Sequence, residues 1–146
     1  MFSSSLHDEK TFYRAFLADL VDCQEEVIIE SPFITTERMK TLWPSLRKLV
    51  AKDVRVYIMT RDPLEHTNGY EEQSELEIQA LEAEGIQVLL CTGNHHRKLA
   101  ILDRRILWEG SLNILSQTKS REFMRRLEGG GFAIDIFNFL NFGRYV

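Results

Sequence analysis

The sequence predicts an α/β fold in which helices flank a mixed β-sheet on both faces. Short apolar runs with many β-branched residues, typical of buried strands, alternate with segments whose apolar residues recur at helical spacing. Such alternation indicates βαβ crossovers. After residue 95 the alternation stops, and two apolar runs separated by a short polar turn predict a hairpin. The expected order is therefore βαβαβ, followed by a hairpin and a C-terminal helix.

The first predicted elements are a helix and a strand. Apolar residues recur at helical spacing over residues 9–21, and Asp8 precedes them as a side chain able to cap the helix. The β-branched run at 27–29 ends at Ser31 and Pro32, so it predicts a short buried strand.

Two further helix–strand units are predicted in the middle of the chain. A helical pattern covers about residues 35–50 and contains Pro44, which predicts a kink or a division into two short helices. A strand is expected over 54–59, an acidic helix over about 71–84 and a third strand over 86–91.

The chain after residue 95 and its first seven residues depart from the alternating pattern. Residues 98–102 and 106–108 form the predicted hairpin, and another strand is expected over about 122–127. Three glycines then introduce an apolar segment, so residues 129–146 are expected to form a C-terminal helix. Residues 1–7 are expected to be a linker or a disordered start.

Length and composition predict one soluble globular domain that spans all 146 residues, of which 44% are hydrophobic and 27% charged. No apolar run approaches the roughly 20 residues needed to span a bilayer, and the N-terminal residues do not resemble a secretory signal. Cys23 and Cys91 lie far apart in the sequence, so no disulfide framework is expected. The predicted location is the cytoplasm.

The charge is unevenly distributed along the chain. The net charge is -4, but residues 97–126 contain eight basic and three acidic residues, so that segment carries +5 and the remainder carries -9. A basic patch on an acidic body can still bind an anionic ligand, since its field acts over about 10 Å. The alternative interpretation is a solvated surface with scattered arginines.

The start of the hairpin carries the residues that suggest chemistry. On extended backbone, side chains two residues apart share a side, so His96 and Lys98 project together while Arg97 points away. Ser111 and Asn113 follow the second strand of the hairpin and add a hydroxyl and an amide.

These groups match the needs of phosphodiester cleavage. The reaction requires a nucleophile, donors for the phosphoryl oxygens and an acid for the leaving alkoxide. A neutral imidazole can serve as nucleophile, because its ordinary pKa is about 6.5. Lys98 and Asn113 can donate to the oxygens. Nothing in this scheme requires a metal or another cofactor.

The same residues resemble a known family signature. His96-x-Lys98, four residues, Asp103, six residues and Gly110-Ser111-x-Asn113 resemble the HKD motif of the phospholipase D superfamily. The preceding βαβαβ pattern resembles one half of that fold, so the resemblance extends over residues 8–128.

The resemblance implies a role for each matching residue. His96 would be the nucleophile and form a phosphohistidine, while Lys98 and Asn113 hold the phosphate. Ser111 would line the pocket, and Asp103 would support the motif without touching the substrate. Glu122 stands where the family often has an acidic residue that orients the histidine, although an exposed glutamate paired with a neighbouring arginine is the alternative.

The motif occurs once in this chain, whereas one imidazole cannot easily serve both as nucleophile and as leaving-group acid. Superfamily members with two motifs supply the second histidine from the other half of the chain. The resemblance therefore implies a homodimer in which two His96 residues share one site. The apolar segment over residues 132–142 is a candidate for the dimer contact, and an ordinary core helix is the alternative.

Small single-motif members of the superfamily are mostly nucleases, so the preferred substrate is DNA, with RNA left open. Arg97, Lys119 and Arg121 in the basic segment would bind it. One alternative is a non-catalytic DNA-binding module of a larger repair or defence protein. Another is a phospholipid phosphodiesterase, although no amphipathic basic helix predicts stable membrane association.

Overall fold

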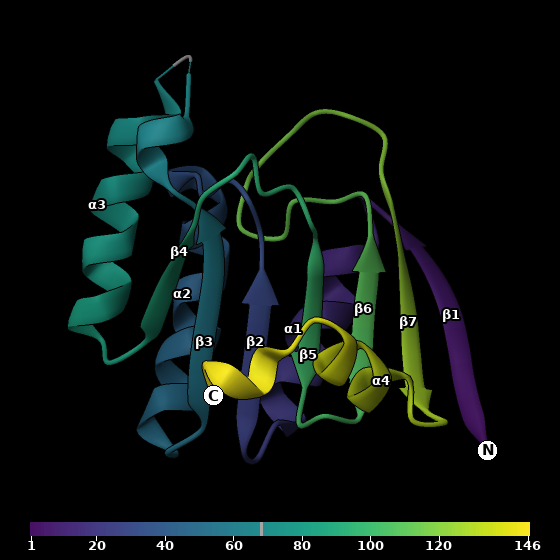
Figure 1. Cartoon of the computed structure of the whole chain (residues 1–146). Coiled ribbons are helices and arrows are strands. Elements are labelled where there is room, and N and C mark those ends of the chain that lie inside the picture. Colours follow the sequence, from purple (N-terminus) through teal and green to yellow (C-terminus); the bar gives the residue numbers. More distant parts are fainter. Residues whose placement is uncertain (68) are drawn as a thin grey trace.

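The computed structural model describes residues 1–67 and 69–146. Its centre is a seven-stranded mixed sheet with the order β1-β7-β6-β5-β2-β3-β4 (Figure 1). The strands are β1 (Phe2–Asp8), β2 (Glu26–Glu30), β3 (Arg55–Arg61), β4 (Gln87–Cys91), β5 (Leu99–Leu102), β6 (Ile106–Gly110) and β7 (Phe123–Gly129). The helices are α1 (Phe12–Asp22), α2 (Thr36–Ala51), α3 (Tyr70–Ala83) and α4 (Phe132–Phe139), with 3-10 turns η1 (Pro63–Glu65) and η2 (Phe142–Arg144).

Strand direction reverses in the middle of the sheet. Strands β2, β3 and β4 are parallel and are joined by the crossover helices α2 and α3. Strand β5 pairs with β2 in the antiparallel sense, with Glu30 opposite Leu99, and β6, β7 and β1 continue antiparallel. The predicted α/β class, with a mixed sheet and a hairpin after the alternating part, is confirmed.

Helices cover the two faces of the sheet unequally. The three helices α1, α2 and α3 pack on one face, where Phe16, Leu46 and Leu81 join a large core with Val27 and Ile29 of β2. Among the described residues the other face carries α4, in front of β5 and β6 in Figure 1, and η2, in front of β2 and beside β3. No helix in the described ranges is long and apolar enough to cross a membrane.

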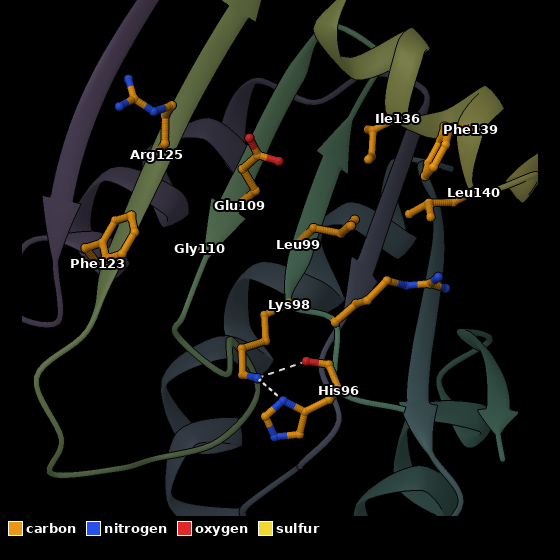
Figure 2. A pocket seen from close by; sticks show the side chains of 11 residues that line it. His96, Lys98, Leu99, Glu109, Gly110, Phe123, Arg125, Ile136, Phe139 and Leu140 are labelled. Atoms are coloured by element: carbon orange, nitrogen blue, oxygen red, sulfur yellow. Dashed lines mark hydrogen bonds between the residues drawn. The ribbon is translucent and has the colours of Figure 1, made fainter. Parts of the chain in front are cut away.

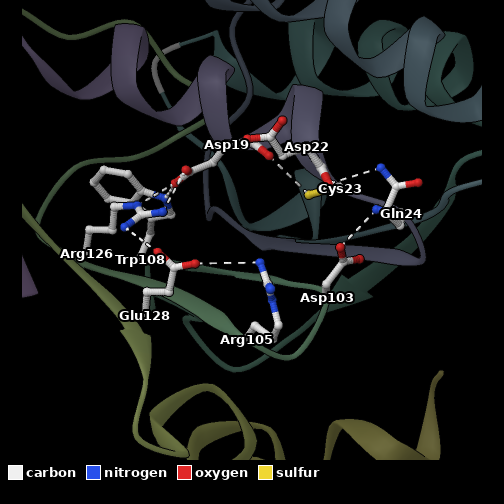
Figure 3. A network of polar contacts seen from close by, with 9 residues as sticks. All are labelled: Asp19, Asp22, Cys23, Gln24, Asp103, Arg105, Trp108, Arg126 and Glu128. Carbon is white, nitrogen blue, oxygen red and sulfur yellow. Dashed lines mark hydrogen bonds and ion pairs between the residues drawn. The ribbon is translucent and has the colours of Figure 1, made fainter. Parts of the chain in front are cut away.

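On the face covered by three helices, a polar network joins helix α1 to the sheet (Figure 3). Asp19 of α1 accepts hydrogen bonds from Trp108 Nε1 at 2.8 Å and from the Arg126 guanidinium at 2.8 and 2.9 Å. Arg126 Nη1 also lies 3.2 Å from Glu128. A single carboxylate thus joins α1 to β6 and β7.

Three local expectations need correction. Residues 2–8 form the edge strand β1, paired along its whole length with β7, rather than a linker or disordered start. The segment over 129–146 contains an eight-residue helix and a 3-10 turn, not one long helix, since positive φ at Gly131 and Asn141 bounds α4. Helix α2 runs without a break through Pro44, with buried leucines on both sides, so the predicted division into two short helices is wrong, while the predicted kink stays a prediction.

Candidate active site

His96 and Lys98 lie side by side between β4 and β5, at the edge of the sheet where β2 and β3 end. Lys98 Nζ is 2.8 Å from His96 Nδ1 and 2.9 Å from the His96 carbonyl oxygen (Figure 2). The structure therefore brings together the two side chains that alternation placed on one side of the backbone. Regular strand geometry begins only afterwards, at Leu99.

The contact determines how protons are arranged in this pair. An ammonium group only donates hydrogen bonds, so His96 Nδ1 is the acceptor and a neutral ring carries its proton on Nε2. Burial lowers the pKa of His96 from its ordinary 6.5, and the charges of Lys98 and Arg61 lower it further. Burial also lowers the pKa of Lys98, against the opposing charge of Glu122. A neutral imidazole beside a cationic lysine is therefore favoured near neutral pH.

Gly110 and Ser111 connect β6 to the start of β7. A Cβ at Gly110 would collide with the Phe123 carbonyl oxygen and lie 2.9 Å from Met124 Cα, so only glycine lets the two backbones approach this closely. The Ser111 hydroxyl accepts a hydrogen bond from the Phe123 N–H at 3.1 Å and lies 3.4 Å from the Phe123 carbonyl oxygen. Ser111 thus fixes the backbone at the mouth of the site.

Asn113 lies on the loop that follows, at the same edge of the sheet. Its Oδ1 is buried and has no hydrogen-bond partner among the described residues. The hydroxyl of Tyr13 donates to the Ile114 carbonyl oxygen at 2.6 Å, which holds this loop against α1. The Asn113 side chain is therefore held in place while its Oδ1 can still accept a hydrogen bond.

Asp103 lies at the opposite end of the hairpin, away from His96. Its carboxylate accepts three backbone N–H bonds, from Gln24, Glu25 and Glu26, each at 2.9 Å. Burial raises the pKa of Asp103, but these bonds outweigh it and the net pKa is lowered from 3.8. The motif aspartate therefore ties the hairpin turn to the start of β2, which agrees with a supporting role.

The remaining predicted site residues do not contact His96. Glu122 accepts a hydrogen bond from Ser120 Oγ at 3.0 Å, and its backbone N–H donates to Glu9. Lys119 and Arg121 are exposed, and neither forms an ion pair within the described ranges. The orienting role of Glu122 and the substrate contacts of the two cations stay predictions.

Arg97 is held in a way that the sequence did not reveal. Its Nε and Nη2 donate to the two carboxylate oxygens of Glu30, at 2.9 and 3.1 Å. Glu30 is fully buried at the end of β2. Arg97 also lines the cavity beside His96 and Lys98, and half of its side chain is exposed, so its predicted contact with substrate stays a prediction.

The same edge collects buried polar atoms that lack partners. Such atoms are costly, and in folded proteins they often mark places where a ligand or water completes the bonding. Sequence reasoning missed most of these residues, because they come from four separate loops and element ends. Within the described ranges the atoms are Arg38 Nε, Arg61 Nε, both ring nitrogens of His66, His95 Nε2 and Asn113 Oδ1.

A cavity of about 560 Å³ opens beside His96 and Lys98. Glu109 of β6 and Arg125 of β7 also line it, and the Arg125 guanidinium is turned toward β1, where Nη1 donates to Ser4 Oγ at 2.6 Å (Figure 2). No group of three or more potential metal ligands is arranged to hold an ion within residues 1–67 and 69–146. Arg97 and Gly110 also line the cavity, and the apolar part of the wall is formed by Leu99, Phe123, Ile136, Phe139 and Leu140.

A family model described as "Cardiolipin synthase, PLD-like domain" matches residues 16–127, which is most of the chain. The chain belongs to the phospholipase D superfamily. No curated protein matches it in sequence.

Solved structures of the superfamily share the fold over nearly the whole chain. NucT from Helicobacter pylori superposes with a TM-score of 0.73 at 18% identity, covering 95% of this chain and 93% of that one. The phospholipase D family member Nuc from Salmonella typhimurium gives 0.70 at 18%, covering 94% and 91%. Phosphatidylserine synthase from Haemophilus influenzae gives 0.68 at 13%, covering 99% of this chain but 39% of the other.

We expect Asp103→Ala to lower the free energy of unfolding by about 2–4 kcal/mol at neutral pH, because three N–H groups lose their acceptor together. The folded pKa of Asp103 is lowered, so its contribution is present above the unfolded value and is lost as the pH falls through the folded one. Urea unfolding between about pH 2 and pH 7 measures this. The exposed Asp22→Ala should change stability by less than about 0.5 kcal/mol. An Asp103→Ala deficit that is constant with pH would contradict the account.

Proposed function

We propose that this protein is a metal-independent phosphodiesterase that cleaves DNA through a phosphohistidine on His96, in a site shared by two copies of the chain. The observation that carries the proposal is the contact of 2.8 Å between His96 Nδ1 and Lys98 Nζ within a phospholipase D fold. The pair combines a neutral nucleophile with a cation for the phosphoryl oxygens. Membership of the superfamily supports phosphodiester chemistry at this pair.

The proposed reaction has two steps. In the first, a ring nitrogen of His96 attacks phosphorus, a P–N bond forms and the P–O bond to the leaving nucleoside breaks. The second copy's His96, cationic at that moment, gives its proton to the departing oxygen. In the second step that imidazole takes a proton from water, the hydroxide attacks phosphorus and the P–N bond breaks. Both rings then regain their starting states.

Lys98 has to change partners when a substrate arrives. In the free protein its ammonium group donates to His96 Nδ1, which leaves the proton on Nε2. A phosphate group competes for that ammonium, since charge-assisted bonds to anionic oxygens are stronger than bonds to a neutral ring. Once Lys98 turns to the phosphate, Nδ1 can carry the proton and Nε2 becomes a free nucleophile. Substrate binding thus activates the histidine.

The sheet face that carries α4 supports the shared site. Several of the most exposed large apolar side chains lie on it, namely Leu6 at 63%, Phe123 at 58% and Phe139 at 83% exposure. Phe123 and Phe139 belong to the apolar wall of the cavity that His96 and Lys98 also line. A second copy that buried this patch about a twofold axis would bring its own His96 toward the same cavity.

Charge favours a polyanionic substrate at this edge. Arg61 ends β3 there, Arg38 lies in the first turn of α2 and Lys98 directly precedes β5. The exposed Lys119 and Arg121 occupy the loop between β6 and β7. The apolar wall is the observation that favours a phospholipid instead, since an acyl chain suits such a surface. We propose that a second copy of the chain covers that wall. Hydrolysis of a phospholipid instead of DNA would contradict this.

We expect His96→Ala to slow DNA hydrolysis by about 10³-fold or more while leaving DNA binding intact, because only the nucleophile is removed. The assay uses single- and double-stranded oligonucleotides with excess EDTA. Because the pKa of His96 is lowered, the acid limb of kcat/KM should fall below about pH 6.5. Vesicles of phosphatidylglycerol serve as the comparison substrate. Activity that needs added Mg²⁺, or that survives in His96→Ala, would overturn the proposal.

We expect Phe139→Asp to raise the dimer dissociation constant about 30-fold or more, since a buried charge replaces an apolar anchor. Activity per chain should fall in parallel as the protein is diluted. Analytical ultracentrifugation and activity measured over the same concentrations test both statements. Val21→Asp, at an exposed apolar residue of α1 on the opposite face, is the matched control and should change neither. A fully active Phe139→Asp monomer would exclude the shared site.

A further inference from the structure

Strand β2 carries a buried glutamate at each end, and each is held by an arginine in nearly the same geometry. Glu26 and Glu30 are 2% and 0% exposed. Arg104 Nε and Nη2 lie 3.0 and 3.1 Å from the two oxygens of Glu26. Arg97 Nε and Nη2 lie 2.9 and 3.1 Å from those of Glu30. The two fork-like pairs clamp the hairpin to β2 at both of its ends.

The two pairs differ in what lies beside them. Arg104 belongs to the turn between β5 and β6, where Asp103 already secures the backbone. Arg97 stands between His96 and Lys98, in a segment that has neither strand nor helix structure. One pair therefore secures a turn that has other anchors, and the other secures the residue next to the nucleophile.

The segment that carries His96 has few other anchors. Glu65 accepts hydrogen bonds from the N–H groups of Gly93 and Asn94, at 2.9 and 3.1 Å, and Arg61 Nη2 lies 2.6 Å from Asn94 Oδ1. These contacts fix its beginning, and the β5 ladder fixes its end. At the centre of the segment, the side chain of Arg97 reaches Glu30.

His95 also points toward this carboxylate. Its Nε2 lies 3.2 Å from a Glu30 oxygen, without the alignment of a hydrogen bond. Residues 95 and 97 thus turn toward the sheet. Because successive side chains of extended backbone point to opposite sides, His96 is directed outward into the cavity.

We propose that the pair of Glu30 and Arg97 is a positioning device for His96, an inference that rests on the proposed function. A buried ion pair contributes little net stability compared with apolar residues of similar size, so stability alone does not explain a fully buried carboxylate here. A small displacement of a reacting group is costly for the rate. Glu30 acts through Arg97 and touches no substrate.

The matched pair at the other end of β2 makes a sharp test possible. Glu30→Gln and Glu26→Gln each keep the side-chain shape and remove one buried charge from the same strand. We expect both variants to lose similar thermal stability. Only Glu30→Gln should lower kcat for bis(p-nitrophenyl) phosphate, by about tenfold or more, with KM changed less than about twofold. Glu26→Gln should retain kcat per folded molecule.

Two further measurements separate positioning from general loosening. The double variant Glu30→Gln with Arg97→Gln should have the same kcat as Glu30→Gln alone, because both substitutions break the same ion pair. In nitrogen NMR of labelled imidazoles, the His96 ring signals and titration should shift in Glu30→Gln and not in Glu26→Gln. If Glu30→Gln does not fold, Arg97→Lys replaces it, since it keeps the charge but not the fork.

Equal kcat values in Glu30→Gln and Glu26→Gln would overturn the inference while leaving the proposed function standing. If the natural protein cleaves no diester, the proposed function fails and the NMR comparison still decides the placement of His96. Unchanged His96 signals in Glu30→Gln would then exclude a positioning role.

Discussion

The antiparallel pairing of β5 with β2 is the constraint on which the site depends. It reverses the direction of the sheet beside the parallel strands and brings the start of β5 to the edge where β2 and β3 end. The hairpin then returns β6 to that edge, so that Ser111 and Asn113, which follow the end of β6, lie on the same edge of the sheet as Lys98. The buried glutamates at both ends of β2 hold this pairing in register. His96, Lys98 and Asn113 therefore reach one edge of the sheet only because distant strands pair in this order.

The sequence predicted those parts of the site that depend on local rules. Alternation along extended backbone placed His96 with Lys98, and the hairpin placed Asp103 at its turn, where it accepts backbone bonds. The motif glycine, Gly110, has a physical reason in the close approach of the β7 backbone. In each case the partner is near in sequence or is the backbone itself, and simple geometry is sufficient.

Features that depend on distant partners could not be predicted in this way. The partner of Arg97 is Glu30, 67 positions earlier, and a charged residue ending an apolar run gives no sign of being buried. Strand β1 contains three serines and little apolar character, so its pairing with β7 depends on an open edge that the sequence does not reveal. Pro44 predicted a kink or two short helices, and α2 continues through it as one helix with buried leucines on both sides.

Electrostatics and incomplete burial point to the same edge. The acidic chain gathers Arg61, Lys98 and His96 there, and desolvation followed by the charges of Lys98 and Arg61 lowers the pKa of His96. The face beside it is only partly covered, because α4 has eight residues and three helices occupy the other side. In this account a second copy of the chain covers the exposed apolar side chains and supplies the second His96 for the proton transfers.

The most direct test of the central claim is to look for a nucleotide bound to the protein during turnover. The reaction with a short DNA strand is stopped by alkaline denaturation, which preserves P–N bonds, and the protein is analysed by mass spectrometry. The account predicts an adduct on His96 that is lost on acid treatment and is absent from His96→Ala. Rapid hydrolysis with no adduct on any histidine, under conditions in which a phosphohistidine standard survives, would contradict it.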